Sequence, residues 1–196
     1  MFANRFTALV DACSLVSALG RNSLLSLAAA ELYRVRWSET ILAETEQALG
    51  GMFAERGVDG PAAVAARQIA AMRRAFPEAT VEDYDELAPA ADALPDPGDA
   101  HVIAAARACR ASVIVTENLR HFPTGPLATI GIEVKSSDEF VADAVDLDPA
   151  LALGALATMR ARFEKPELTA EALLLHYESQ GFILTADLLR HHVGRL

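Results

Sequence analysis

Residues 6–29 read FTALVDACSLVSALGRNSLLSLAA, a short and mostly apolar run followed by an aspartate and a longer segment rich in leucine and alanine. A short apolar run is typical of a strand that is buried on both faces of a parallel sheet. The leucine spacing after Asp11 predicts a helix that continues to Ala28. We therefore expect Asp11 at the point where a strand over Phe6–Val10 ends and a helix begins.

Short extended segments and helical patterns alternate along the chain beyond this point. The expected strands are 34–37, 79–81, 112–115 and 130–134, the last at a sheet edge, and the expected helices are 39–49, 61–76, 100–110 and 138–145. The proline-containing stretch 82–98 predicts a loop with at most one helical turn. Alternation of this kind is typical of an α/β fold with a mainly parallel central sheet.

Only helical patterns remain beyond residue 147. Helices are expected over 149–163, 170–180 and 182–192, with starts at Asp148 and Thr169 and a break at Gly181. We therefore expect a main domain over residues 1–146 and a small all-helical C-terminal extension over residues 147–196.

The composition indicates a globular protein. Of the 196 residues, 52% are hydrophobic and 22% are charged, which excludes a disordered chain. Asp11 interrupts the apolar segment Ala8–Leu19, and a membrane span or signal-peptide core would tolerate that charge badly. We expect a soluble, cytoplasmic protein without a membrane segment. The two cysteines, Cys13 and Cys109, lie in apolar runs and predict reduced thiols rather than a disulfide framework.

The negative charge is unevenly distributed. The net charge is −10, and 15 of the 27 acidic residues lie between residues 77 and 148. This balance argues against a broad basic surface that would coat a nucleic acid. The acidic side chains either form a solvated surface or converge in part on a cation. Of the 17 basic residues 15 are arginines, the side chain better suited to binding phosphate.

Several polar residues follow the expected strands directly. Asp11 comes after the first strand, Thr116 and Asn118 come after the strand 112–115, and Asp99 begins the helix that leads into that strand. Ligands of α/β folds bind outside the carboxyl ends of the strands. We therefore expect these residues to meet at one edge of the sheet. A carboxylate flanked by apolar residues, as Asp11 is, must find a partner or a metal ion.

Each of the other candidates has a structural alternative. Asp99 can be a helix N-cap and Asp96 a turn residue. Glu44 lies about a turn from the apolar stripe of its helix and can be an ordinary surface residue. Asn118 and His121 can belong to a turn after the strand. The sequence alone leaves these alternatives open.

Motifs of other enzyme classes are absent from the sequence. It contains no glycine-rich phosphate loop, no CxxC pair, no HExxH and no GxSxG. The chemistry that remains is a divalent cation held by carboxylates, and Mg²⁺ and Mn²⁺ both prefer oxygen ligands.

Four segments, taken in this order, resemble PIN-domain ribonucleases of the VapC toxin family. They are LVDAC (9–13), WS with Ile41 and Glu44 (37–44), LPDPGDAHV (94–102) and IVTENLRHFP (114–123). The resemblance covers roughly residues 8–140, and the helical tail is similar to the C-terminal extension of longer VapC-like proteins.

The resemblance implies a PIN-like three-layer α/β/α nuclease domain over residues 1–146. It also implies a Mg²⁺-dependent endoribonuclease, with Mn²⁺ as the other candidate ion, that is the toxin of a type II toxin–antitoxin system. A VapB-like antitoxin, an RNA substrate and a second copy of the chain are the implied partners.

The resemblance also assigns roles to individual residues. Asp11 and Asp99 become metal ligands, Glu44 completes the acidic catalytic site, and Asn118 joins it from the fourth motif. The implied accessory residues are Asp96, Thr116 and His121. His121 is a departure, because the family often has Asp before Phe-Pro. The imidazole removes one negative charge and should weaken metal binding, or it meets a substrate phosphate when protonated. Cys13 stands where many relatives have a hydrogen-bonding Asn.

Our hypothesis is that Asp11 and Asp99, with Glu44 assisting, hold one or two Mg²⁺ ions that activate water and stabilise the charge on a scissile RNA phosphate. The candidates for positioning the RNA backbone are Arg21, Arg34 and Arg36. The alternative is a catalytically weakened PIN scaffold that binds RNA or protein without cutting. A metal-dependent phosphatase ranks last, because the sequence shows no nucleophile signature.

Overall fold

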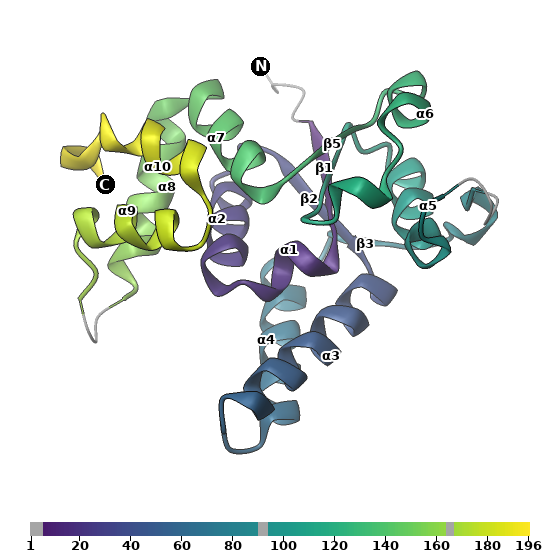
Figure 1. Ribbon diagram of the computed structural model, residues 1–196, viewed down its shortest axis with the longest axis horizontal. Helices are drawn as coiled ribbons and strands as arrows, with labels where there is room; N and C mark the ends of the chain where they lie inside the picture. The colour runs from purple at the N-terminus through teal and green to yellow at the C-terminus, as the bar shows by residue number, and fades with distance from the viewer. Residues whose placement is uncertain (1–5, 90–93, 164–166) are drawn as a thin grey trace.

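The computed structural model of the protein describes residues 6–89, 94–163 and 167–196. Its centre is a five-stranded sheet with the order β3-β2-β1-β4-β5, and every neighbouring pair of strands is parallel (Figure 1). The strands are β1 (Thr7–Val10), β2 (Arg34–Ser38), β3 (Thr80–Val81), β4 (Val113–Val115) and β5 (Glu133–Lys135). The predicted α/β fold with a parallel sheet is confirmed, and β5 lies at an edge as expected.

Helices cover both faces of this sheet. They are α1 (Ala12–Val16), α2 (Ala18–Ala29), α3 (Glu39–Glu55), α4 (Pro61–Ala75), α5 (Ala100–Ala108), α6 (Thr124–Thr129) and α7 (Ser137–Leu147). Helix α5 contacts β1, β2 and β4, whereas α2 and α7 pack against each other on the other side of the sheet (Figure 1). The expected three-layer α/β/α arrangement is therefore confirmed.

Strand β1 occupies the middle of the sheet. Ala8, Leu9 and Val10 are completely buried, which explains why the run is apolar on both faces of the strand. From β1 the chain moves outward through β2 to β3 and then crosses back to place β4 on the other side of β1. The strand order thus reverses between β1 and β4, and such a reversal is where α/β folds form a binding crevice. Asp11 and Thr116 follow these two strands, and the Asp11 N–H donates to the Val115 carbonyl at 2.9 Å.

The long helix expected after Asp11 is interrupted. Ser17 adopts an extended conformation, and its hydroxyl accepts a hydrogen bond from the N–H of Gly20 and so caps α2. Serine competes with helix geometry by bonding the nearby backbone in this way. Helices α1 and α2 both pack on the core, so the apolar periodicity continues across Ser17. Because the periodicity does not reveal the interruption, the prediction of one continuous helix was wrong.

Other elements also differ from expectation, among them β5, which runs over Glu133–Lys135 instead of 130–134. Helix α3 continues through Gly50 and Gly51 to Glu55 instead of ending at Leu49. The short helix α6 was not predicted. The stretch 82–98 holds one 3-10 turn, η1 (Asp85–Leu87), and enters a second, η3 (Pro97–Asp99), where at most one turn was expected. Residues 90–93 of that stretch lie outside the described part of the chain.

The C-terminal segment is helical, as predicted. It contains α8 (Pro149–Ala161), α9 (Ala170–Ser179), α10 (Ile183–Arg190) and the 3-10 turn η5 (Val193–Arg195). Helix α8 packs on α2, and α10 packs on α7, so that these helices gather at one side of the molecule (Figure 1). The boundary after residue 146 remains a prediction. Within the described ranges, no helix is both long and apolar enough to cross a membrane.

Two contacts join α2 to the tail closely. The buried hydroxyls of Ser23 and Tyr177 lie 2.6 Å apart. A Cβ atom on Gly20 would lie 3.1 Å from the ring of Phe182, so the glycine allows α2 and the start of α10 to approach each other. Burial of these contacts makes the tail part of the hydrophobic core.

Helix α10 receives its N-terminal cap from another helix. Phe182, the residue before α10, offers no side-chain cap. The carboxylate of Asp138 in α7 instead accepts hydrogen bonds from the N–H groups of Leu184 and Thr185, at 3.0 and 2.9 Å. An aspartate that accepts these unpaired donors is favourable for the positive end of the helix dipole.

We predict that Asp138→Ala lowers the free energy of unfolding by about 1–2 kcal/mol, because two N–H donors of α10 lose their acceptor. Urea unfolding followed by circular dichroism measures this change. Asp146→Ala in the same helix is the matched control, because Asp146 is exposed, and it should change stability by less than about 0.5 kcal/mol. Equal stability of the two variants would contradict the assigned cap.

Candidate functional site

Asp11 is the most enclosed acidic residue of the candidate site, with 4% of the residue exposed. Its Oδ1 accepts a hydrogen bond from the Ala12 N–H at 2.7 Å, so the carboxylate caps α1. Its Oδ2 accepts from the Thr116 hydroxyl at 2.8 Å and from the Cys13 thiol at 3.2 Å. The expectation that a carboxylate in apolar surroundings finds partners is confirmed, and these partners fix its orientation at the sheet edge.

Thr116 and Cys13 form the support of Asp11. The Thr116 hydroxyl is completely buried and also accepts from the Asn118 N–H at 3.1 Å. Burial, together with the charge of Asp11, raises the pKa of the Cys13 thiol to about 11. The thiol therefore keeps its proton at neutral pH and can donate it to Asp11. Cys13 thus supplies a hydrogen bond at the position where the family resemblance places an Asn.

Glu44 extends from α3 toward the same edge. Burial raises the pKa of its carboxyl, and so do the charges of Asp11 and Asp99, while His101 opposes the shift. Glu44 is therefore a partly exposed helix residue that lies close enough to Asp11 and Asp99 to be influenced by both. The structure brings these three carboxylates into one electrostatic cluster.

Sequence reasoning missed His101. Its Nε2 lies 3.2 Å from Oε1 of Glu44, and its buried Nδ1 has no hydrogen-bond partner among the described residues. A buried N–H without an acceptor is costly, which favours the tautomer that donates from Nε2 to Glu44. The only signal was its position two residues after Asp99 on the same helical turn, and that position did not indicate a contact with a residue of α3.

Asp99 occupies the N-cap position before α5 but does not cap the helix with its side chain. The N-cap alternative is therefore wrong for the carboxylate, whose Oδ2 lies 2.8 Å from Nδ1 of His121. Burial raises the pKa of Asp99, the charges of Asp11 and Asp96 raise it further, and His121 lowers it. Because the Asp99 carboxylate makes no hydrogen bond to the start of α5, it is available to bind a ligand.

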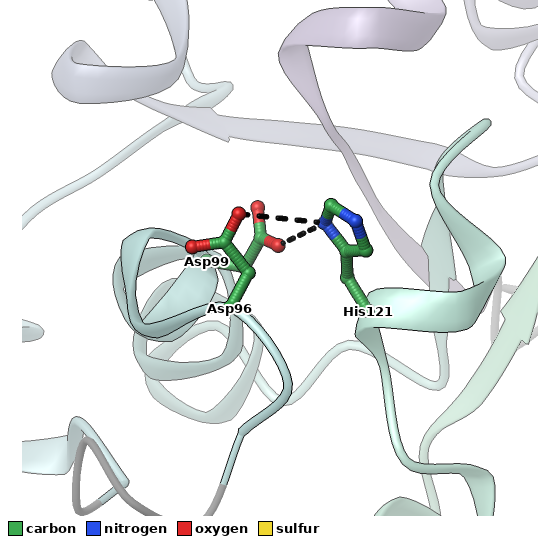
Figure 2. Close-up of side chains that lie close together, drawn as sticks. All are labelled: Asp96, Asp99 and His121. Carbon is green, nitrogen blue, oxygen red and sulfur yellow. Dashed lines mark hydrogen bonds and ion pairs between the residues drawn. The ribbon is translucent and has the colours of Figure 1, made fainter.

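Asp96 is a turn residue, as its structural alternative proposed, and it also reaches the site. Its Oδ1 accepts from the Gly98 N–H at 2.9 Å, while Oδ2 lies 3.7 Å from Nδ1 of His121. Figure 2 shows Asp96 and Asp99 pointing toward the imidazole from one side and His121 approaching from the other. One donor atom from each of these three residues lies within 4.8 Å of the others. Asp11 and Glu44 are outside this tighter group.

Asn118 lies in the turn between β4 and the 3-10 turn η4 (Leu119–His121). Its carbonyl accepts from the His121 N–H at 2.8 Å and so closes η4. The side chain is exposed and makes no hydrogen bond in the described ranges. A catalytic role for Asn118 remains a prediction.

The three arginines expected to position RNA do not line this edge. Arg21 is buried and donates to the carbonyls of Leu15 and Val16 and to Gln68. Arg34 pairs with Thr7 at the start of β1, at the opposite end of the strand from Asp11, and the Arg36 guanidinium donates to the Glu78 carbonyl ahead of β3. Those assignments were wrong because the sequence shows the sign of a charge but not the end of the strand at which it lies.

The donor set of the site fits a divalent cation. Carboxylate oxygens from Asp96 and Asp99 gather with one imidazole nitrogen from His121, and the charges of Asp11 and Glu44 lie nearby. Mg²⁺ and Mn²⁺ accept carboxylate oxygens, and Mn²⁺ also accepts the imidazole nitrogen. Close carboxylates repel each other, and a cation relieves that repulsion. The arrangement can therefore bind a metal ion and, through it, a phosphate.

Two family models match the chain. Residues 7–120, more than half of the chain, match the family model described as "PIN domain", and residues 137–191 match the model described as "VapC50 C-terminal domain". A Mycobacterium tuberculosis protein named "Putative ribonuclease VapC50" is 38% identical over 76 residues. That alignment covers 39% of this chain and 45% of the relative, so the chain spans less than half of the length of that protein. No solved structure matches the chain.

We predict that Thr116→Val lowers the free energy of unfolding by about 1–3 kcal/mol. Valine has nearly the same shape as threonine but cannot donate a hydrogen bond to the buried Asp11 carboxylate. Chemical unfolding at pH 7 in the presence of a chelator measures this loss. Thr158→Val on α8 removes an exposed hydroxyl and should change stability by less than about 0.5 kcal/mol. If both variants match the wild type, Thr116 does not support Asp11.

The raised pKa of Asp99 predicts a pH-dependent effect of Asp99→Asn. A carboxyl group with a higher pKa in the folded than in the unfolded state stabilises the fold at low pH, and this contribution is lost as pH rises through the folded-state pKa. The stability of Asp99→Asn minus that of the wild type should therefore increase between pH 4 and pH 7, measured in chelator by urea unfolding. A difference that is constant or decreasing with pH would contradict the assigned environment.

Proposed function

This chain belongs to the PIN domain family, and we propose that it is a metal-dependent endoribonuclease that hydrolyses phosphodiester bonds in RNA. The observation that carries the proposal is the electrostatic cluster of Asp11, Glu44 and Asp99 at the carboxyl ends of β1 and β4. Three segments distant in sequence supply these carboxylates. The similarity to a protein named as a ribonuclease supports the choice of RNA as substrate.

The bound cation, Mg²⁺ or Mn²⁺, would supply a polarised water and positive charge next to the scissile phosphate. Asp11 and Asp99 are the proposed metal ligands. Thr116 and Cys13 hold Asp11 in one orientation through their hydrogen bonds, so little reorganisation is needed when a ligand arrives. Glu44, whose carboxylate lies 3.2 Å from Nε2 of His101, would complete the acidic site and act as the general base.

The turn after β4 supplies the side of the site that faces RNA. Asn118 and Arg120 are both exposed there, next to His121. We assign them to contacts with the substrate, Asn118 through its amide and Arg120 through its guanidinium, which suits a phosphate. We therefore assign the positioning of the RNA backbone to Arg120 rather than to Arg21, Arg34 or Arg36.

The partner proposed for the chain is a VapB-like antitoxin, which would make the protein the toxin of a type II toxin–antitoxin pair acting on cytoplasmic RNA. The match of residues 137–191 to the VapC50 C-terminal domain supports this assignment. A homodimer is the proposed assembly. The nuclease domain over residues 1–146 and the extension over residues 147–196 are the proposed division of the chain.

A second candidate function is a PIN scaffold that binds RNA or protein without cutting. The contact that favours it is His121 against Asp99, because an imidazole there takes the place of one anionic ligand. Titration with Mg²⁺ and Mn²⁺ separates the two functions, since a scaffold without catalysis needs no bound cation.

We predict that Asp11→Asn and Asp99→Asn each reduce metal-dependent RNA cleavage by at least about 100-fold. The reason is that loss of a residue that merely supports a metal ligand already costs about 10–100-fold. Cleavage of a labelled RNA in Mg²⁺ and in Mn²⁺ measures the loss. Asp146→Asn, at the exposed far end of α7, should retain activity. Cleavage that survives both site substitutions in folded protein would reject the proposed nuclease.

A further inference from the structure

His121 is held in a fixed place beside two carboxylates. The turn η4 is closed by the hydrogen bond from its N–H to the Asn118 carbonyl, and the next residue, Phe122, is buried in the core with 2% exposed. The backbone on both sides of the imidazole is therefore anchored. Such anchoring keeps Nδ1 directed at Asp99 and Asp96 (Figure 2).

The separations between these donor atoms suit a common metal ion. Nδ1 lies 2.8 Å from Oδ2 of Asp99 and 3.7 Å from Oδ2 of Asp96. Metal–ligand bonds of about 2.1 Å in an octahedron place neighbouring donors about 3 Å apart. The separation from Asp99 is near that value, and the separation from Asp96 is longer. Asp96 is the exposed member of the three, and its side chain would move toward His121 to complete the arrangement.

Asp96 is prepared for this role by the backbone. Its Oδ1 is occupied by the Gly98 N–H, which leaves Oδ2 directed toward His121. A Cβ atom on residue 98 would approach Oδ1 of Asp96 to 3.1 Å, so the glycine makes room for the carboxylate in this position. The orientation of Asp96 thus depends on the local turn rather than on chance exposure.

The imidazole changes which ion the donors select. Mg²⁺ prefers oxygen ligands and is usually bound through one or two carboxylates with several waters. Imidazole nitrogen is a softer donor that suits first-row transition ions, and Mn²⁺ accepts both nitrogen and carboxylate ligands. A set of two carboxylates and one imidazole therefore favours a first-row ion more than three carboxylates would.

We propose that His121, through Nδ1, is a direct metal ligand together with Asp96 and Asp99, and that this nitrogen makes the site select Mn²⁺ over Mg²⁺. The inference rests on the proposed function, since it specifies the ion that serves the same site. Asp99 belongs to both groups, because its carboxylate contacts His121 and its pKa is also raised by the charge of Asp11. His121 is then a ligand in its own right and not only a weakened substitute for an acid.

The test uses the full chain without a histidine tag, stripped of metal, in three forms: wild type, His121→Asp and His176→Asp. His176→Asp is the matched control, because it makes the same chemical change at an exposed position of α9. Pulsed electron paramagnetic resonance of bound Mn²⁺ detects coupling to a ligand nitrogen. Calorimetric titration with Mn²⁺ and with Mg²⁺ gives the affinity ratio of the two ions.

We expect nitrogen coupling in the wild type and in His176→Asp, and its loss in His121→Asp. The Mn²⁺-to-Mg²⁺ affinity ratio should fall by about tenfold in His121→Asp, the lower end of the effect of losing a metal-supporting residue. Coupling that is absent from the wild type, or that persists in His121→Asp, would overturn the proposal, as would an unchanged affinity ratio or a failure to bind either ion. Unfolding midpoints show whether each variant is folded.

RNA cleavage, measured separately, distinguishes this inference from the proposed function. Nitrogen-coupled Mn²⁺ binding without any RNA cleavage would reject the nuclease and keep His121 as a ligand. Metal-dependent cleavage without nitrogen coupling would keep the nuclease and reject His121 as a ligand.

Discussion

Repulsion between carboxylates is the constraint on which the candidate site depends. Burial is the largest cause of the raised pKa values of Glu44 and Asp99, and the charges of the neighbouring carboxylates add a cost of repulsion. The protein limits it with a hydrogen-bond donor beside each carboxylate: Thr116 and Cys13 at Asp11, His101 at Glu44 and His121 at Asp99. The fold can therefore hold the acids together before a cation arrives, which leaves the site organised for binding.

The parallel sheet makes this gathering possible. Because β1 and β4 are neighbours whose chain connections leave in opposite directions, their carboxyl ends border one crevice. Asp11 and Thr116 each follow one of these strands, and their hydrogen bond joins the two strand ends. Helix α5 starts beside them and brings Asp96, Asp99 and His101 to the same edge. The position of the site thus follows from the strand order.

Much of this could be predicted from the sequence because the relevant signals are local. The buried run before Asp11, the alternation of strands and helices, and the polar residues at strand ends are all visible in short windows of sequence. The sequence could not show the pairing of Glu44 with His101 or the capping of α10 by Asp138, because those contacts join residues far apart in the chain. It also misplaced Arg21 and Arg34, since residue type does not specify burial or the end of a strand.

The close fit between α2 and the tail limits how this protein can change over generations. Gly20 faces Phe182, and Ser23 shares a buried hydrogen bond with Tyr177. Recombination that replaced the tail with that of a distant homologue would bring in side chains that do not match α2. Substitutions on the two sides of this seam should therefore accumulate in compensating pairs, and the extension should be inherited together with α2 rather than as an exchangeable module.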